Sequence, residues 1–202
     1  MRDLPALSLD DRLAILANES KVVSECVRCA ELAATRTRTV YGVGSPQARV
    51  CFLGEAPGAD EDRLGEPFVG RAGQLLTKII EACTLRREDV YIFNPLKCRP
   101  PDNRKPLPNE IANCRGYLER QIEAIRPEFI CCLGATATET LLEVSNVSLA
   151  RLRGKFHDYR GIAVMVTYHP SYLLRNPAAK KDVWDDMQML MKRMGIELPK
   201  RG

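Results

Sequence analysis

Four short runs of apolar residues divide the chain. They are RVCFLGE at 49–55, VYIFNPL at 90–96, EFICCLGA at 128–135 and IAVMVTYH at 162–169. Within each run the apolar positions are nearly continuous rather than alternating, as in strands that are covered on both faces. The runs therefore predict four buried strands.

Segments with helical periodicity lie between these runs. Apolar residues recur at helical spacing in 70–83 and in 108–125, and Pro127 stands just beyond the second segment as a stop signal. Further helices are expected from Ala135 and over about 178–194. Strands that alternate with helices predict an α/β fold with a parallel sheet and helices on both of its faces.

Ligands of parallel α/β sheets gather at the carboxyl ends of the strands. The segments that follow the four strands are GEAPG, NPLKC, LGATAT and YHPSYLLR. Functional side chains are therefore expected in these four segments.

The chain has 202 residues, which suits one α/β domain over 1–202, with a flexible tail expected at about 196–202. The first twenty residues contain no continuous apolar stretch, and no apolar run reaches the ~18 residues of a membrane span. We therefore expect a cytoplasmic protein without a membrane segment, whose thiols stay reduced, and we expect it to be a monomer.

Charge is distributed unevenly although the net charge is only +4. Residues 97–106 and residues 151–160 each carry four basic residues against one acidic residue. Two basic segments on a nearly neutral protein suggest a polyanionic partner. A merely solvated face is an equally weighted alternative.

Four of the eight cysteines follow the apolar pattern. Cys51, Cys131 and Cys132 lie inside strand runs, and Cys83 lies on an apolar helix face. Free cysteine is among the most buried residue types, so core packing is expected for these four.

The other four cysteines stand in a different context. Cys26 and Cys29 form a C-V-R-C motif, Cys98 lies between two basic residues, and Cys114 falls on the inward stripe of its helix. Together they predict a four-thiolate site for zinc or an iron–sulfur cluster, which spacing alone does not separate. A redox C-x-x-C motif with two unrelated cysteines is the alternative.

Candidate chemistry follows the strands. His169 ends the fourth predicted strand, Asn94 ends the second, and Phe68 lies in a loop flanked by proline and glycine. An asparagine amide both donates and accepts, as reading one edge of a pyrimidine requires. The acidic residues 60–62 offer a general base or, alternatively, a helix start favoured by the helix dipole.

With these residues in view, the chain resembles the family 4 uracil-DNA glycosylases, the iron–sulfur branch of the uracil-DNA glycosylase superfamily. The resemblance runs from about Cys26 to the last helix. It is carried by C-V-R-C, GEAPGADEDRLGEPFVGRAGQLL, NPLKCRPPDNRKPLPNE, Cys114 and YHPSYLLR. The family implies a three-layer α/β/α sandwich around a central four-stranded parallel sheet.

The resemblance also implies a cofactor. It is a [4Fe–4S] cluster that clamps the N-terminal segment, to about residue 45, onto the body of the protein. Its implied ligands are Cys26, Cys29, Cys98 and Cys114. We expect a structural role for the cluster, because a hydrolysis needs no electron.

Residue by residue, the resemblance implies an active site. Glu55 and Ala56 match the motif whose backbone shapes the uracil pocket, and Glu55 is counted with the catalytic residues. The implied catalytic residues Glu61 and His169 act on the water or sugar cation and on uracil O2, respectively. Phe68 would stack on the base and Asn94 would read it.

Contacts to DNA are implied on either side of this pocket. Tyr172, Leu173, Leu174 and Arg175 match a loop that enters the minor groove, with the two leucines as wedges. Arg99, Arg104 and Lys105 belong to the first basic segment and are expected to hold phosphates.

The predicted function is a monofunctional uracil-DNA glycosylase that flips uracil out of DNA and releases it as the free base, with a sliding clamp as an untested partner. The chain lacks the histidine-containing basic insert of a related branch that traps the sugar, so ordinary turnover is expected. The main alternative is a non-catalytic iron–sulfur module that binds DNA. A metal-stapled cysteine or histidine hydrolase and a glycosylase of broader scope are the others.

Overall fold

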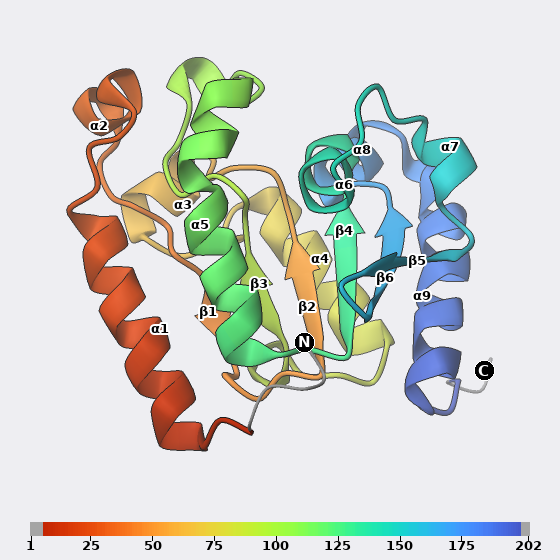
Figure 1. The fold of residues 1–202 in the computed structure, drawn as a ribbon. Coiled ribbons are helices and arrows are strands. Elements are labelled where there is room, and N and C mark those ends of the chain that lie inside the picture. Colours follow the sequence, from red (N-terminus) through yellow and green to blue (C-terminus); the bar gives the residue numbers. More distant parts are fainter. Residues whose placement is uncertain (1–5, 199–202) are drawn as a thin grey trace.

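A computed structural model describes residues 6–198, and a six-stranded sheet forms its centre (Figure 1). The strand order is β1-β3-β2-β4-β6-β5. The four predicted strands are present and parallel: β2 (Val50–Leu53), β3 (Tyr91–Phe93), β4 (Phe129–Leu133) and β6 (Ile162–Thr167). The predicted α/β class and the parallel four-stranded centre are confirmed.

The expected strand count needs a correction at both edges of the sheet. β1 (Val43–Gly44) pairs with β3 and β5 (Phe156–Tyr159) pairs with β6, both antiparallel. Both edge strands lack a continuous apolar run: β1 has two residues, and β5 is only partly buried. Continuous apolar runs mark only strands that are buried on both faces, so the sequence pattern did not predict these two edge strands.

Helices cover both faces of the sheet, which confirms the three layers. One face packs on α1 (Leu9–Ser24), α2 (Ala30–Thr35), α5 (Pro108–Ile125) and α6 (Ala135–Leu142). The other face packs on α4 (Arg71–Ala82), α8 (Pro170–Arg175) and α9 (Lys180–Met194). The predicted helices thus appear as α4, α5, α6 and α9.

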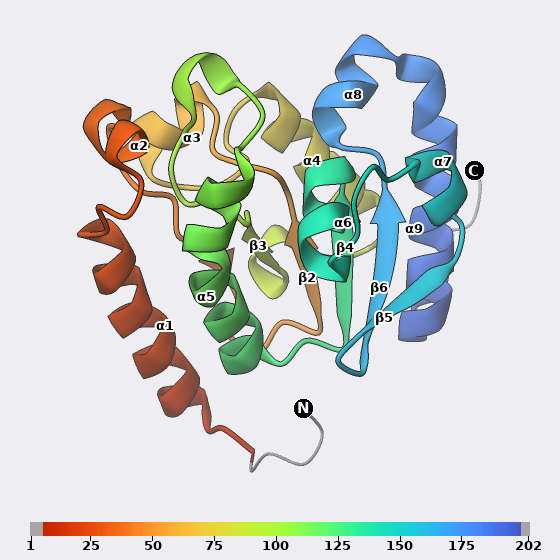
Figure 2. The ribbon, with the colours of Figure 1, turned by 45° about the horizontal axis from the view of Figure 1, so that its top comes forward.

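The remaining helical elements are short connections. They are α3 (Ala59–Leu64), α7 (Leu149–Leu152) and the 3₁₀ turns η1 (Arg87–Asp89), η2 (Pro101–Asn103) and η3 (Pro177–Ala179). Figure 2 brings the upper rim of the molecule forward, where α2, α3, the loop before α5 and α8 are gathered.

The N-terminal helix α1 begins at a reciprocal capping box. The Ser8 hydroxyl accepts from the Asp11 amide, and the Asp11 carboxylate accepts from the Ser8 amide. α1 then packs against α5, and Leu16 and Val23 enter the core on that side of the sheet. The predicted single domain over 1–202 stays a prediction, and residues 199–202 of its expected flexible tail lie outside the described residues.

Strand register sets the positions of the predicted site segments. Leu53 pairs with Phe93 on one side and with Cys132 on the other, and Leu133 pairs with Thr167. The segments that follow these strands therefore leave the sheet at one edge, side by side. Across residues 6–198, no helix is long and apolar enough to cross a membrane.

Candidate active site and cysteine centre

A cavity of about 430 Å³ opens at the carboxyl ends of the strands. Ligand sites of small molecules commonly have volumes of about 300–1,000 Å³. Eight of the predicted site residues line this cavity: Glu55, Ala56, Glu61, Phe68, Asn94, Arg104, His169 and Arg175. Its other lining residues, which the sequence argument did not select, are Pro57, Gly58, Ala72, Pro100, Asn103 and Ser171.

Phe68 forms an aromatic wall of the cavity. Its ring centroid lies 5.5 Å from that of His169, with an interplanar angle of 35°. Gly54 makes this close packing possible, because a Cβ there would lie 2.3 Å from Asn94 Oδ1 and 2.6 Å from the Phe68 ring. A side chain at position 54 would therefore displace the two groups that meet in the cavity.

Asn94 carries an unpartnered polar atom. The residue is 2% exposed, and its Oδ1 is buried without a hydrogen-bond partner among the described residues. A buried oxygen without a partner costs about 1–3 kcal/mol. Because Asn94 lines the cavity, a ligand N–H would remove this cost.

His169 caps α8 and is held in one tautomer. Its Nδ1 accepts from the Ser171 amide at 3.1 Å and lies 2.8 Å from the Ser171 hydroxyl. A neutral ring that accepts at Nδ1 carries its proton on Nε2, so it offers a donor there. Burial, assisted by the positive charge of Arg175, lowers the pKa of His169 to about 4, so the ring is neutral at pH 7.

The three adjacent acidic residues have different environments. Glu61 Oε1 accepts from the amides of Val69 and Gly70, both at 2.9 Å, and Oε2 accepts from Gly58 at 3.2 Å. Asp60 is exposed and pairs with Arg63. Of the three, Glu61 alone lines the cavity, but its two oxygens are already engaged by backbone amides.

Asp62 faces away from the cavity and is 3% exposed. Its carboxylate accepts from the amide of Thr37, with both oxygens at 3.0 Å, and from that of Arg38 at 3.4 Å. Two successive carboxylates thus hold different segments: Glu61 the loop around Phe68, and Asp62 the segment after α2.

Glu55 is oriented from the neighbouring βα unit. Thr136, in the first turn of α6, donates to Glu55 Oε2 at 2.5 Å. Thr136 is buried, and it lies in the strand-end segment LGATAT, but the sequence did not single it out because its partner lies 81 positions away.

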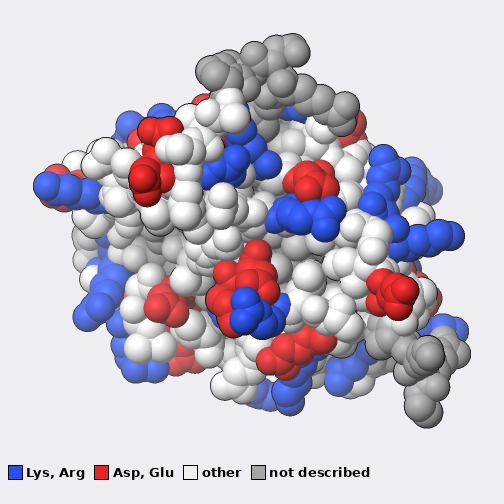
Figure 3. Space-filling view, turned by 90° about the horizontal axis from the view of Figure 1, so that it is seen from below, with Lys and Arg blue, Asp and Glu red and all other residues white. Residues whose placement is uncertain are grey.

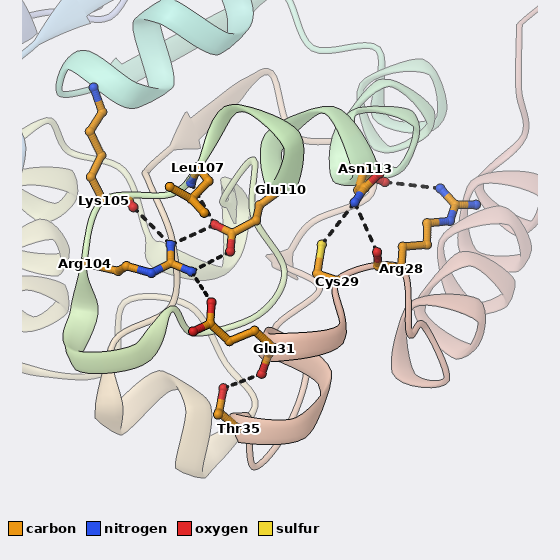
Figure 4. Close-up of polar contacts among 9 residues, drawn as sticks. All are labelled: Arg28, Cys29, Glu31, Thr35, Arg104, Lys105, Leu107, Glu110 and Asn113. Atoms are coloured by element: carbon orange, nitrogen blue, oxygen red, sulfur yellow. Dashed lines mark hydrogen bonds and ion pairs between the residues drawn. The ribbon is translucent and has the colours of Figure 1, made fainter.

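The first basic segment is less available to a polyanion than its composition suggested. Lys97 is 1% exposed, so it is not a surface charge. Arg104 pairs with Glu31 and Glu110, both at 2.7 Å (Figure 4), and Lys105 pairs with Glu139 at 3.1 Å. The interpretation of 97–106 as a basic surface segment was therefore wrong for Lys97. Two further basic residues of the segment, Arg104 and Lys105, are already engaged in ion pairs.

Lys97 instead braces the interior. Its Nζ donates to the Asn94 carbonyl at 2.7 Å, to Gln121 Oε1 at 2.5 Å and to the Tyr41 carbonyl at 3.1 Å. Burial lowers the pKa of Lys97 to about 7, while the neighbouring Cys114 and Cys98 thiols oppose that shift. This network connects the backbone of Asn94 to α5.

The loop after His169 is only partly exposed. Tyr172 and Leu174 are 38% and 40% exposed, but Leu173 is 1% exposed and packs in the core with α4 and α9. The expectation of two leucine wedges therefore needs a correction, because the helical turn of α8 directs successive side chains to different sides. Leu174 is the leucine that this conformation presents.

Core packing was predicted for four of the eight cysteines, but six are buried, including the candidate ligands Cys98 and Cys114. Cys51, Cys83, Cys131 and Cys132 are buried in the apolar core, which confirms that prediction. The C-V-R-C motif lies between α1 and α2, Cys98 follows β3, and Cys114 lies on α5.

The four candidate ligands lie near one another. Burial raises the pKa of Cys98, and the charges of Cys26 and Cys29 add to that shift. Burial likewise raises the pKa of Cys114 to about 11, with Cys98 and Cys29 contributing. Over residues 6–198, however, no three His, Cys, Asp or Glu side chains form a group that could hold a metal ion.

Two of these sulfurs each accept a hydrogen bond from a neighbouring side chain. Arg36 Nη1 donates to Cys98 Sγ at 3.1 Å, and Asn113 Nδ2 donates to Cys29 Sγ at 3.4 Å (Figure 4). Such donors stabilise thiolates, and buried thiols with raised pKa values gain from a cationic centre that holds them deprotonated. The chemistry of this donor set therefore fits a thiolate-ligated iron–sulfur group.

The opposite end of the sheet contains a larger cavity of about 820 Å³, near the amino ends of β4 and β6. Figure 3 views this lower side, where basic and acidic residues are interspersed. Its lining includes Arg12, Arg160 and Arg193 together with Glu128 and Asp158. None of the predicted site residues lines it.

His157, the second histidine, is not part of the 430 Å³ cavity. It lies on β5, and its Nε2 is 2.8 Å from the Leu152 carbonyl.

The ring of Phe68, the buried amide of Asn94 and the neutral imidazole of His169 lie around one cavity at the strand ends, an arrangement that suits a planar base. The chain belongs to the uracil DNA glycosylase superfamily, whose family model matches residues 41–188. Among curated proteins, a Type-4 uracil-DNA glycosylase of Archaeoglobus fulgidus is 42% identical over 88% of this chain and 92% of the relative. A Type-4 uracil-DNA glycosylase of Thermotoga maritima is 49% identical over 78% and 82%, respectively.

The Type-5 relatives are more distant. A Type-5 uracil-DNA glycosylase of Pyrobaculum aerophilum is 31% identical over 73% of this chain and 79% of the relative. The chain is thus more similar to the two Type-4 proteins, as the motifs of the sequence indicated.

Proposed function

We propose that this protein is a uracil-DNA glycosylase: it hydrolyses the N-glycosidic bond of uracil in DNA and leaves an abasic site. The observation that carries the proposal is the unpartnered Oδ1 of Asn94, a residue that lines the same cavity as Phe68 and His169. The substrate is uracil-containing DNA and the product is free uracil.

Recognition of the base follows from the chemistry of Asn94. Its Oδ1 accepts from uracil N3–H, and its amide N–H₂ donates to O4. Cytosine has an acceptor at N3 and an amino donor at position 4, so the same amide meets a mismatch at both atoms. The Phe68 ring stacks on the face of the base.

Bond cleavage leaves negative charge on uracil and positive charge on the sugar. His169, neutral and protonated on Nε2, donates to O2 as the negative charge develops. A preorganised donor of this kind contributes about 2.7–4 kcal/mol to lowering the barrier. Glu61 contributes negative charge near the sugar cation while its oxygens hold the loop around Phe68.

A uracil in duplex DNA must be flipped out of the stack, which costs a few kcal/mol. Leu174 and Tyr172 are the exposed apolar residues of α8, so we assign the wedge to Leu174. Arg99 and Arg175 hold phosphates, and Arg104 and Lys105 join them only when DNA displaces their carboxylate partners.

The cysteine centre holds a [4Fe–4S] cluster in this proposal, with Cys26, Cys29, Cys98 and Cys114 as ligands. The cluster ties the C-V-R-C segment to Cys98 and to α5 and so supplies structural stabilisation. The protein acts as a monomer in the reducing cytoplasm, where its DNA substrate is found.

One purified sample tests both parts of this proposal. Absorbance near roughly 400 nm is expected from the cluster, and alkali-labile cleavage is expected at the uracil of a single-uracil oligonucleotide. A coloured protein that binds the oligonucleotide without releasing uracil would instead establish a non-catalytic DNA-binding module.

The Asn94→Asp variant tests the base assignment. Because aspartate only accepts when ionised, it cannot donate to O4, so the ratio of uracil to cytosine release should fall. An unchanged ratio would remove Asn94 from base recognition.

A further inference from the structure

Phe68 has a backbone conformation that needs support. Its φ is +55°, in the left-handed region that bulky side chains rarely adopt. Strained residues of this kind cost about 1–3 kcal/mol and persist only where the surrounding structure holds them. Because Phe68 is also the aromatic wall of the cavity, the groups that hold its backbone set the position of the ring.

Two oppositely charged side chains hold the backbone of this loop, one through its N–H groups and the other through its C=O groups. Glu61 accepts from the amides of Val69 and Gly70, as described above. Arg87 Nη2 donates to the carbonyls of Pro67 at 2.8 Å and of Phe68 at 3.0 Å. The peptide between Phe68 and Val69 is therefore held at its N–H by a carboxylate and at its C=O by a guanidinium. The same two side chains hold the Gly70 N–H and the Pro67 C=O on either side of it.

Arg87 is itself anchored and lies outside the cavity. It belongs to the turn η1 before β3, and its Nη1 donates to the Thr77 hydroxyl on α4 at 3.1 Å. It is not among the residues that line the cavity. Arg87 thus contacts the Phe68 peptide without lining the cavity.

The helix α4 packs closely against the Phe68 peptide. A Cβ at Gly73 would lie 1.9 Å from the Phe68 carbonyl oxygen, so the Phe68 peptide rests directly on the first turn of α4. With α4 beneath it, the carboxylate on one side and the guanidinium on the other, the peptide has one position.

We propose that Arg87 is a positioning residue for base stacking: it holds the strained Phe68 peptide so that the ring meets the flipped base. This inference rests on the proposed function, in which Phe68 stacks on uracil. Arg87 touches neither the base nor the reacting bond. Its removal should act through Phe68 alone.

The test is a double-mutant cycle on the full-length protein with a single-uracil oligonucleotide under single-turnover conditions. Arg87→Met should lower the cleavage rate about 10- to 100-fold, the scale expected from a misplacement near 1 Å. In Phe68→Ala the ring is already absent, so adding Arg87→Met to it should change the rate less than twofold. Affinity for an oligonucleotide without uracil should stay unchanged in both single variants.

Arg86→Met is the matched control. Arg86 is the adjacent residue, is exposed, and pairs with Asp89 at 2.8 Å, with no contact to the 67–70 loop. Its replacement removes the same charge from the same turn and should leave the rate at the wild-type value.

Three results would overturn the proposal. The first is a cleavage rate of Arg87→Met equal to that of Arg86→Met. The second is a double variant whose rate loss equals the product of the losses in Arg87→Met and Phe68→Ala, because the two residues would then act independently. If Arg87→Met does not fold, Arg87→Lys replaces it in the same cycle. The third result is that neither variant folds, which would make Arg87 a residue needed for folding in general and not for the position of Phe68. A wild-type protein that releases no uracil would instead refute the proposed function, which keeps the two failures distinct.

Discussion

The base cavity and the cysteine centre are built in different ways. Around the cavity, protein groups hold one another: Ser171 orients His169, Thr136 orients Glu55, and backbone amides hold Glu61. In the cysteine centre, Cys26 and Cys29 are only half-buried, and Val27 between them is 73% exposed. The polar groups of the cavity are thus oriented by protein contacts from several elements, whereas the half-exposed C-V-R-C segment is held to α5 through Arg28 and Cys29, which contact Asn113.

This difference predicts which changes affect chemistry and which affect assembly. Substitutions in the cavity should change the rate with little effect on folding. Substitutions at the four candidate ligand cysteines should change cofactor content and stability first.

The largest effect is expected from His169→Ala. Removing the Nε2 donor should lower the single-turnover rate about 10²- to 10³-fold, with a small loss of DNA affinity. His157→Ala is the control, because His157 lies outside the cavity and should keep the wild-type rate. Wild-type cleavage by His169→Ala would exclude His169 from the site.

Cys98→Ser should abolish the chromophore and lower the unfolding temperature. Serine keeps the size of the side chain but not the thiolate that binds iron. Cys83→Ser is the control and should retain the absorbance, because Cys83 lies in the apolar core on the opposite face of the sheet, with α4, α8 and α9. Iron and sulfide content measured in both variants checks this, and a full complement in Cys98→Ser would break the proposed ligand set.

The two leucines of α8 should separate folding from DNA binding. Leu173→Ala deletes a buried core side chain and should lower the free energy of unfolding by about 2–5 kcal/mol. Leu174→Ala should change that free energy by less than about 0.5 kcal/mol, yet slow cleavage in duplex DNA more than in single strands. Denaturant titration and paired cleavage assays measure the two effects, and equal stability losses would refute the division.

The smallest effect concerns pH. Because burial lowers the pKa of His169 to about 4, the ring stays neutral over pH 5–8, and the cleavage rate should show no fall with a midpoint near 6.5. The unfolded protein takes up this proton at higher pH than the folded one, so the stability from this group falls as pH drops from about 6.5 to about 4. A rate profile centred near 6.5 would mean an ordinary, solvated histidine.

Local pattern determined much of this protein. The continuous apolar runs located all four parallel strands, and α5 begins at Pro108 and ends at Ile125, the bounds of the predicted segment. The strand-end rule then selected Asn94 and His169, and the loop flanked by proline and glycine selected Phe68; all three line one cavity. These features were predictable because burial on both faces and backbone direction at a strand end are properties of neighbouring residues.

Long-range packing decided the rest. Composition placed Lys97 in a basic surface segment, whereas Gln121 and two carbonyls hold it in the interior. Arg104 acquired two carboxylate partners, Leu173 turned into the core, and Arg87 reached the peptide of Phe68. Whether a charge or an apolar side chain is exposed depends on partners 20 to 80 positions away, as Arg87 and Gln121 illustrate. The sequence alone determined the four central strands, the helices α4, α5, α6 and α9 and the residues at the strand ends. The tertiary structure decided which side chains remain free to meet a ligand, because only packing shows which hydrogen-bonding groups are already satisfied.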